Sequence, residues 1–110
     1  MSPGWFPLDD ECGPLHGRFL MALRRHALDW PASLDPLHSG AFMLDGVLAT
    51  YVDVVGEDGS MTSLRVDYDG SLLYADETLG GLGVSGSPDA CAAEGSRWFL
   101  EKLFGSSSRA

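Results

Sequence analysis

Hydrophobic positions recur along the chain with two different periods, and the change of period separates helical from extended segments. Between residues 14 and 30 the apolar positions return every three or four residues, with arginines on the opposite side, which predicts an amphipathic helix. Pro14 suits the first position of that helix, and Pro31 ends it because a proline disfavours helical geometry in the preceding residue. The apolar positions of this predicted helix are Leu15, Phe19, Leu20, Leu23, Ala27 and Trp30.

The middle of the chain alternates apolar and polar residues and contains three Asp-Gly pairs, at residues 45–46, 58–59 and 69–70. Asp-Gly between apolar runs favours tight hairpins because both residues tolerate a positive φ. One face of the alternating runs is apolar and the other carries charge, which is typical of an antiparallel sheet covered on one side. We therefore predict a four-stranded antiparallel meander within residues 41–76. Its strands are 41–44, 47–55, 61–68 and 71–75.

A glycine-rich stretch, residues 78–87, follows the predicted sheet and is interpreted as a flexible loop. Ser87 fits an N-cap, and Pro88 fits the first position, of a second helix that runs to residue 104. This helix is apolar on more than one side, since Leu100 and Phe104 fall off the face that holds its other apolar residues. A second apolar side favours a partner or a dimer mate.

The chain is thus predicted to be one α+β domain over residues 1–110, because its length leaves no room for a second core. An irregular arm (1–13), a helix (14–30), the meander (41–76), a second helix packed on one face of the sheet (87–104) and a disordered tail (106–110) follow one another.

The net charge of the chain disfavours some classes of binding partner. Sixteen acidic and seven basic residues give a net charge of −9, which weighs against nucleic acid and anionic lipid. No apolar run approaches the roughly 20 residues of a membrane helix. Between Asp29 and Glu94 the sequence has twelve acidic residues and one Lys or Arg, which is Arg65, so the local net charge is −11. That region is either a solvated sheet face that keeps the protein soluble or a surface that steers a basic partner protein.

The chemistry-bearing residues do not form a catalytic or metal-binding pattern. Gly81-x-Gly83-x-x-Gly86 lacks the second parallel strand of a dinucleotide site, and the two cysteines and three histidines lack zinc-site spacing. We therefore expect no enzymatic activity, no cofactor and no metal. A disulfide between Cys12 and Cys91 would bridge the arm to the last helix. The first residues carry no secretory signal, however, so we expect free thiols and a cytoplasmic protein.

Three groups of segments carry a resemblance to a known family. They are Leu34-Asp35-Pro36 with Ala41-Phe42-Met43-Leu44-Asp45-Gly46-Val47-Leu48, Leu72-Leu73-Tyr74-Ala75 with Leu79-Gly80, and Phe99-Leu100-Glu101-Lys102-Leu103-Phe104-Gly105. They resemble the first strand pair, the strand that leads into the second helix, and the Leu-Phe-Gly ending of the class I effector chaperones of type III secretion. That family continues with two more strands and a third helix, so the likeness is either to a truncated member or a convergence on a common plan of helix, meander and helix.

The resemblance implies a non-catalytic chaperone-like protein whose surface binds an extended segment of a secreted partner protein and keeps that segment unfolded. The first predicted helix and the edge of the meander near Phe42 and Leu44 would supply that surface, and Phe42 and Leu44 are the apolar candidates for partner binding. The resemblance also implies a homodimer, for which the candidate contacts are Trp98, Leu100 and Phe104.

The acidic region supports a different class of function. Asp53, Asp67 and Asp69 lie on or beside the predicted strands and are the charged candidates for partner binding. An inhibitor or immunity-type protein, with a nucleic-acid mimic as its extreme form, would use these acids to block a basic toxin or enzyme. Both alternatives are protein-binding modules without a catalytic residue.

Overall fold

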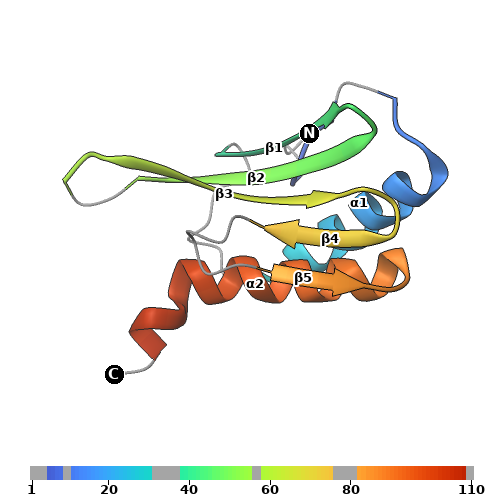
Figure 1. The fold of residues 1–110 in the computed structure, drawn as a ribbon. Helices are drawn as coiled ribbons and strands as arrows, with labels where there is room; N and C mark the ends of the chain where they lie inside the picture. The colour runs from blue at the N-terminus through green and yellow to red at the C-terminus, as the bar shows by residue number, and fades with distance from the viewer. Residues whose placement is uncertain (1–4, 9–10, 31–37, 56–57, 76–81, 109–110) are drawn as a thin grey trace.

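The computed structural model describes residues 5–8, 11–30, 38–55, 58–75 and 82–108 (Figure 1). Its elements, in chain order, are α1 (Pro14–Ala27), β1 (Ser39–Leu44), β2 (Val47–Val55), β3 (Met61–Tyr68), β4 (Leu72–Ala75), β5 (Leu82–Ser85) and α2 (Pro88–Ser108). The strands form one antiparallel sheet in the order β1-β2-β3-β4-β5. The predicted α+β class and antiparallel meander are confirmed, and the meander has five strands rather than four.

The additional strand, β5, lies inside the stretch that the sequence predicts as a glycine-rich loop. It pairs with β4, opposing Leu82 to Ala75 and Val84 to Leu73. Leu82 and Val84 alternate with residues that face the other way, and both pack against the core. The prediction gave weight to the glycines and overlooked this short period-two pattern, in which two buried side chains are enough to hold a strand on the sheet.

The two turns whose residues are described bear out the Asp-Gly prediction in different ways. Asp45 and Gly46 both adopt a positive φ, 51° and 80°, as a two-residue hairpin between β1 and β2 requires. In the turn between β3 and β4, Gly70 has a φ of 103° and the carboxylate of Asp69 accepts the N–H groups of Ser71 and Leu72. The side chain of Asp69 therefore accepts two N–H groups for which the turn supplies no backbone acceptor.

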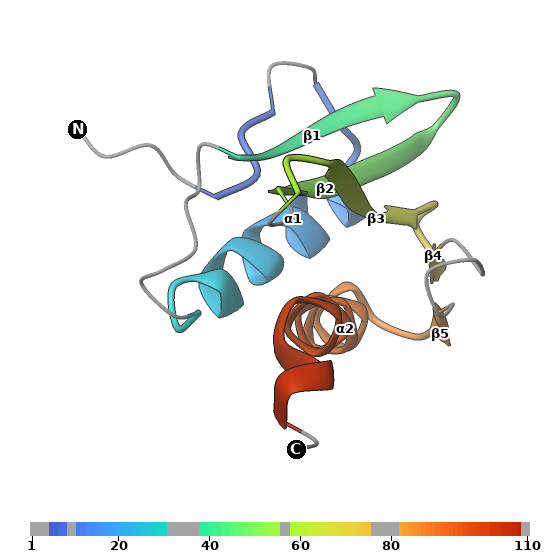
Figure 2. The ribbon, with the colours of Figure 1, turned by 90° about the vertical axis from the view of Figure 1, so that its left-hand side faces the viewer.

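The helices form a second layer on one side of the sheet. Figure 2 shows the sheet curving around them, with α1 beneath β1 and β2 and with α2 beside β4 and β5. α1 ends at Ala27, three residues before the predicted end, and α2 continues to Ser108, past the predicted end at residue 104. In the described part of the chain, neither helix combines the length and the apolar character needed to cross a bilayer.

The N-terminal arm is part of the core. Phe6 is fully buried although its φ is 52°, and Trp5 is 7 % exposed. Arg24 of α1 donates from Nε to the carbonyl of Trp5 and from its terminal nitrogen to the carbonyl of Phe6, both at 3.0 Å. The N–H of Phe6 donates to Oγ of Ser39 at 2.9 Å, which joins the arm to β1. These three hydrogen bonds fix the arm between α1 and the sheet.

One buried hydrogen bond joins the end of the first helical region to α2. Nε1 of Trp30 donates to Oγ of Ser96 at 2.9 Å, and the two residues are 6 % and 5 % exposed. The indole ring also packs at 5.8 Å from the ring of Phe99. A buried indole N–H needs an acceptor because water cannot reach it.

We expect the substitution Ser96→Ala to lower the free energy of unfolding by about 1–3 kcal/mol, because it leaves the buried indole N–H of Trp30 without an acceptor. Urea denaturation followed by tryptophan fluorescence measures this change. Ser85→Ala, a matched change at an exposed serine of β5, is the control. A loss at Ser96 no larger than that of the control would contradict the role assigned to this bond.

Candidate protein-binding surface

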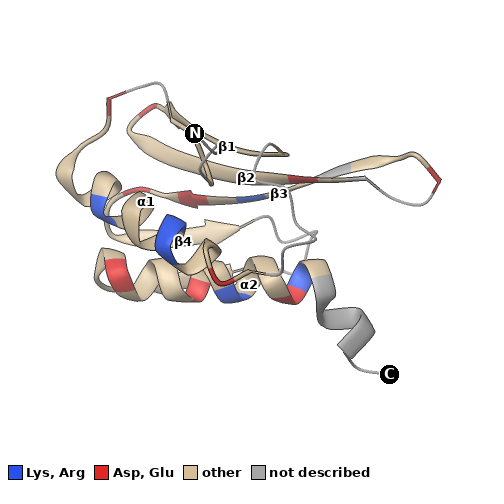
Figure 3. Cartoon of the chain, turned by 180° about the vertical axis from the view of Figure 1, so that it is seen from behind, with Lys and Arg blue, Asp and Glu red and all other residues tan. Residues whose placement is uncertain are grey.

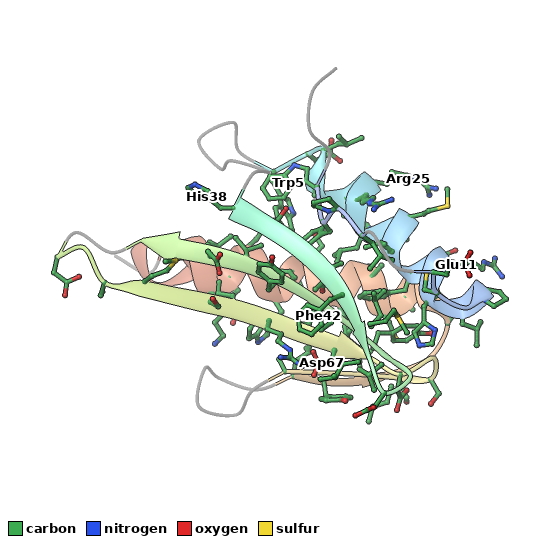
Figure 4. The ribbon with its side chains drawn as sticks, turned by 90° about the horizontal axis from the view of Figure 1, so that it is seen from above. Trp5, Glu11, Arg25, His38, Phe42 and Asp67 are labelled. Carbon is green, nitrogen blue, oxygen red and sulfur yellow. The ribbon has the colours of Figure 1, made fainter. Side chains whose placement is uncertain are left out.

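The face of the sheet that points away from both helices is the candidate site, and we call it the outer face. Figure 4 views the molecule from this side, with Phe42 and Asp67 labelled on it. Because side chains alternate along a strand, the neighbours of buried residues such as Leu48, Val66 and Leu73 point outward. Within the described residues, neither helix covers this face (Figure 2).

The strand register arranges the outward side chains in rows that cross the sheet. The central row runs through all five strands, from Phe42 through Ala49, Asp67 and Tyr74 to Gly83. A second row, at the end that carries the β1–β2 and β3–β4 turns, pairs Leu44 with Val47 and Leu72 with Ser85. On the other side of the central row lie Gly40, Tyr51 and Arg65, followed by Asp53 and Ser63.

An arginine–aspartate pair occupies the middle of the outer face. Nε of Arg65 donates to Asp67 at 2.8 Å and its terminal nitrogen donates to the second carboxylate oxygen at 3.1 Å. The guanidinium also lies 5.1 Å from the centre of the Phe42 ring, within cation–π range. The hydrogen bond to Asp67 raises the pKa of Arg65 above its ordinary value, so the guanidinium stays charged. Each charge of this pair is thus satisfied within the molecule.

Aromatic rings surround that pair. Tyr51 lies 6.2 Å from Phe42, and its ring covers Gly40, where a Cβ atom would collide with it. Ala49 is fully buried although it points outward and is absent from the helix-facing core, so side chains of the outer face cover it. Burial, and next the negative charge of Asp67, raise the pKa of Tyr74. The central row is therefore a packed aromatic and ionic cluster.

The row beside the turns is open, and it holds three apolar side chains, Leu44, Val47 and Leu72, with Asp69 of the β3–β4 turn between Val47 and Leu72. Leu44 is 52 % exposed and Leu72 is 40 % exposed, while Val47 between them is half-buried. Single exposed apolar residues are ordinary, but apolar side chains that share one row form a patch. Leu15 of α1, 46 % exposed, lies beside the β3–β4 turn, where a Cβ atom added to Gly70 would be 3.8 Å from its Cδ1 atom. The outer face thus offers an apolar strip beside the aromatic cluster.

Acidic side chains border this face, and serines hold several of them. Oγ of Ser63 donates to Asp53 at 2.5 Å across the β2–β3 hairpin. The hydroxyl of Ser60 and then its N–H hold the pKa of Asp58 below its ordinary value. Figure 3 shows acids on the strands and turns, and the arginines of α1 on the helical layer. In the described part of the chain, Arg65 is the one basic residue of the sheet.

The structure brings four of the five predicted partner-binding residues to one surface. Phe42, Leu44, Asp53 and Asp67 all point from the outer face, although they come from three strands. Asp69 instead lies in the β3–β4 turn, where one carboxylate oxygen accepts from Ser71 and Leu72. Its first role is therefore structural, and its charge lies at the border of the face.

The three predicted dimer contacts lie on α2 in different surroundings. Trp98 is 5 % exposed and packs edge-on against Phe99 at 5.5 Å, within the core. Leu100 is half-buried and packs against the same core. The side chain of Phe104 lies outside the described residues. The homodimer therefore stays a prediction, with little of Trp98 left for a second copy to contact.

The predicted partner-binding residues do not include Tyr51, Arg65 and Tyr74. The alternation of the strands places Tyr51 and Arg65 on the charged face of the predicted sheet, and the same alternation identifies Tyr74 as outward-facing. Their neighbours across the strands depend on the register, which hydrophobic alternation within one strand does not specify. The sequence indicates that these side chains point outward, but only the register of the folded sheet shows that they lie together in one cluster.

The two cysteines do not form a disulfide. Cys12 and Cys91 are both free, as expected. Burial, and then the charge of Asp69, raise the pKa of Cys91, so its thiolate is disfavoured. The Cys91 thiol lies 3.7 Å from the carbonyl oxygen of Val84, where it joins α2 to β5. Among the residues that the structure describes, no group of three His, Cys, Asp or Glu side chains is arranged to hold a metal ion.

The turn at Asp69 generates a pH prediction. The N–H groups of Leu72 and Ser71 hold the pKa of Asp69 below its ordinary value, so its ionised form stabilises the fold above the unfolded-state pKa of about 3.9. That stabilisation is lost as the pH falls through the lower folded-state pKa. We expect Asp69→Asn to destabilise the protein at pH 6 and to do so progressively less toward pH 2.5, measured by urea denaturation at each pH. An equal destabilisation at both pH values would contradict this assignment.

Comparisons with protein-family models, with curated proteins and with solved structures return no match to this chain. The inference of function therefore rests on the outer face itself.

Proposed function

We propose that the protein is a non-catalytic protein-binding module that captures an extended segment of a partner protein on the outer face of its sheet. The observation that carries this proposal is the apolar row of Leu44, Val47 and Leu72 beside the Phe42 cluster, on a face that no described helix covers. A sheet buries its apolar side chains against another layer, and here a partner would supply that layer. The cytoplasm, which the sequence analysis predicts, is the proposed place of capture.

The edge of β1 contributes less than the sequence suggests. β1 is an edge strand, but the carbonyl of Pro7 accepts the N–H of Ala41 at 3.0 Å. The arm of the same chain therefore occupies that hydrogen-bonding position, where an added strand would otherwise pair. This contact favours capture on the face over capture along the edge.

An inhibitor or immunity-type function is the second candidate, and the acidic border supports it. Asp53, Asp58 and Asp69 stand around a sheet with a single arginine, and that arginine is already paired with Asp67. A basic toxin or enzyme would be attracted at a rate that falls as salt rises. Such a partner would bind in its folded state.

A small basic test protein separates the two functions. One sample is folded, and the other is reduced and alkylated so that it stays unfolded. The amino-acid sequence is the same in both samples, so a difference in binding reports the folded state alone. We expect the unfolded form to bind at least about tenfold more tightly, because only it can place apolar side chains on the outer face. Isothermal titration calorimetry measures both affinities. Tighter binding of the folded form, with a salt-dependent association rate, would favour the inhibitor instead.

The variant Phe42→Ser/Leu44→Gln tests the surface. We expect it to lower the affinity for the unfolded form by about tenfold or more, because interface energy concentrates in a few apolar anchors. Met21→Gln/Leu28→Gln, a control on the exposed side of α1, should leave the affinity within about twofold. Equal losses in the two variants would contradict capture by the outer face.

The homodimer is tested independently. Light scattering after gel filtration should give a salt-independent mass twice that of one chain if an apolar contact on α2 joins two copies. Leu100→Gln should then shift the mass toward that of a monomer. A monomer in the unmodified protein would remove the dimer and leave the outer face as the binding surface.

A further inference from the structure

The hydrogen bonds at the start of β4 fix which backbone groups of β5 face the free edge of the sheet. The N–H of Asp69 donates to the carbonyl of Leu72 at 3.2 Å, and the N–H of Leu72 donates to the carboxylate of Asp69 at 2.7 Å. The backbone of Leu72 therefore points toward β3. Successive residues of a strand direct their N–H and C=O groups to opposite sides, so the backbone of Leu73 points toward its partner Val84 on β5. The residues on either side of Val84 consequently direct their backbone groups away from β4.

These two residues are Gly83 and Ser85, and both are exposed. They offer two N–H donors and two C=O acceptors, and among the described residues no group outside the sheet bonds to them. Within the same residues, no heavy atom lies within 4 Å of the position of a Cβ atom at Gly83. Figure 2 shows α2 on the inner side of β5 rather than beyond its edge. β5 also has no charged residue and no proline, which protect many edge strands from pairing.

The backbone of a captured segment needs such groups. An extended segment has its own N–H and C=O groups, and each one that is buried without a partner is costly. The opposite edge of the sheet is closed at Ala41, because Pro7 accepts its N–H. The edge of β5 therefore supplies hydrogen-bonding partners at the border of the outer face.

A strand added to β5 would extend the rows of the outer face. Its residue opposite Gly83 would continue the central row beyond Tyr74, and its residue opposite Ser85 would continue the row of Leu72. Because Gly83 has no side chain, a large side chain opposite it can cover the glycine and approach Tyr74. The small residues of β5 thus favour large side chains at alternate positions of the bound segment.

A second copy of this chain fits the edge less well. Paired along β5, it would bring only its own Gly83 and Ser85 to the outer face, and both are too small to cover Gly83 of the first copy. Two chains that each carry a net charge of −9 also repel one another. A partner segment with large side chains meets neither obstacle.

We propose that the edge of β5 binds an extended segment of the partner protein as a sixth strand, whose apolar or aromatic residues at alternate positions lie on the outer face. This inference rests on the proposed function and names the backbone contact and the side-chain pattern of the captured segment. Gly83 and Ser85 exchange backbone hydrogen bonds with the residues opposite them. The side chains of those residues cover Gly83 and extend toward Tyr74 and Leu72.

Three synthetic peptides of one sequence, alternating phenylalanine and threonine between terminal lysines, test this inference with the full chain. The first is unmodified, the second is N-methylated at its phenylalanines, and the third is N-methylated at its threonines. In a strand, residues whose side chains share one face also direct their N–H groups to one edge. A peptide with its phenylalanines on the outer face therefore turns their N–H groups toward β5 and those of the threonines away.

We expect the second peptide to bind at least about tenfold more weakly than the first, because it lacks the N–H groups that the carbonyls of Gly83 and Ser85 accept. The third peptide, the matched control, should bind within about threefold of the first. Fluorescence anisotropy gives these affinities. Amide hydrogen exchange followed by NMR should show exchange at Gly83 and Ser85 slowed at least about tenfold by the first peptide, with little change at Val84, which β4 already binds.

The substitution Ser85→Pro tests the edge from the side of the protein. It removes an N–H that faces solvent in the free chain, a position where an edge strand tolerates proline, and should lower the affinity for the first peptide by about tenfold. Ser85→Ala keeps the N–H and should leave the affinity within about twofold. Urea denaturation checks that both variants are folded. The peptide comparison needs no substitution, so it decides the matter if the proline disrupts β5.

The outcomes separate this inference from the proposed function. Equal binding of the first two peptides, or unchanged exchange at Gly83 and Ser85 on binding, would overturn the added strand. A loss of affinity in Phe42→Ser/Leu44→Gln would then keep the outer face as the capture site. Slow exchange at both residues in the free protein, with a dimer mass in light scattering, would assign the edge to a second copy and overturn the inference. Failure of the first peptide to bind would also overturn it, and the unfolded test protein would decide separately whether the capture function stands.

Discussion

The structure depends on the aromatic cluster that Phe6 brings together. Its ring lies 5.6 Å from Phe99 of α2 and 5.9 Å from Trp30 after α1, and Trp5 lies 4.8 Å from Trp30. A positive φ at a residue as large as Phe is strained, at a cost of about 1–3 kcal/mol, and persists only when the surroundings fix it. Here Arg24 and Ser39 hold the backbone on both sides of that residue. The arm therefore joins the two helices to the edge of the sheet.

This closure explains why the two faces of the sheet differ. The inner face is saturated, since α1, α2 and the arm leave no described large apolar side chain of the central strands exposed there. No described helix covers the outer face. Its own side chains, Phe42, Tyr51 and the Arg65–Asp67 pair, lie over Ala49 and cover only part of the face. The exposed row of Leu44 and Leu72 is what that self-covering does not reach. Apolar side chains thus stay exposed on the outer face because the core closes on the inner side of the sheet alone.

Features that depend on residues close together in the sequence were predicted, and features that depend on residues far apart in the sequence were not. Helix periodicity, hairpin alternation and Asp-Gly turns are local, and they predicted both helices and four of the five strands. β5 was missed because two apolar side chains within a glycine-rich stretch give a weak local signal, and its stability comes from packing on β4 and α2. The sequence left open whether Trp5 and Phe6 cover the core or form a contact surface, and the pairing of Arg65 with Asp67 was beyond local reasoning. These contacts are set by register and by long-range closure, which one-dimensional periodicity does not contain.

The acids of the sheet do not all have the same origin. Asp45 adopts a positive φ in a hairpin turn, and Asp58 and Asp69 accept hydrogen bonds from serines two residues later, so the turns themselves account for these three carboxylates. Asp53 has no such local cause, because it lies within β2 and aspartate is disfavoured in strands. Ser63 holds it by a single cross-strand bond to one oxygen, and no described basic side chain neutralises it. The acidity of the region is therefore in large part a consequence of turn chemistry, and Asp53 is the carboxylate whose presence most favours a basic partner.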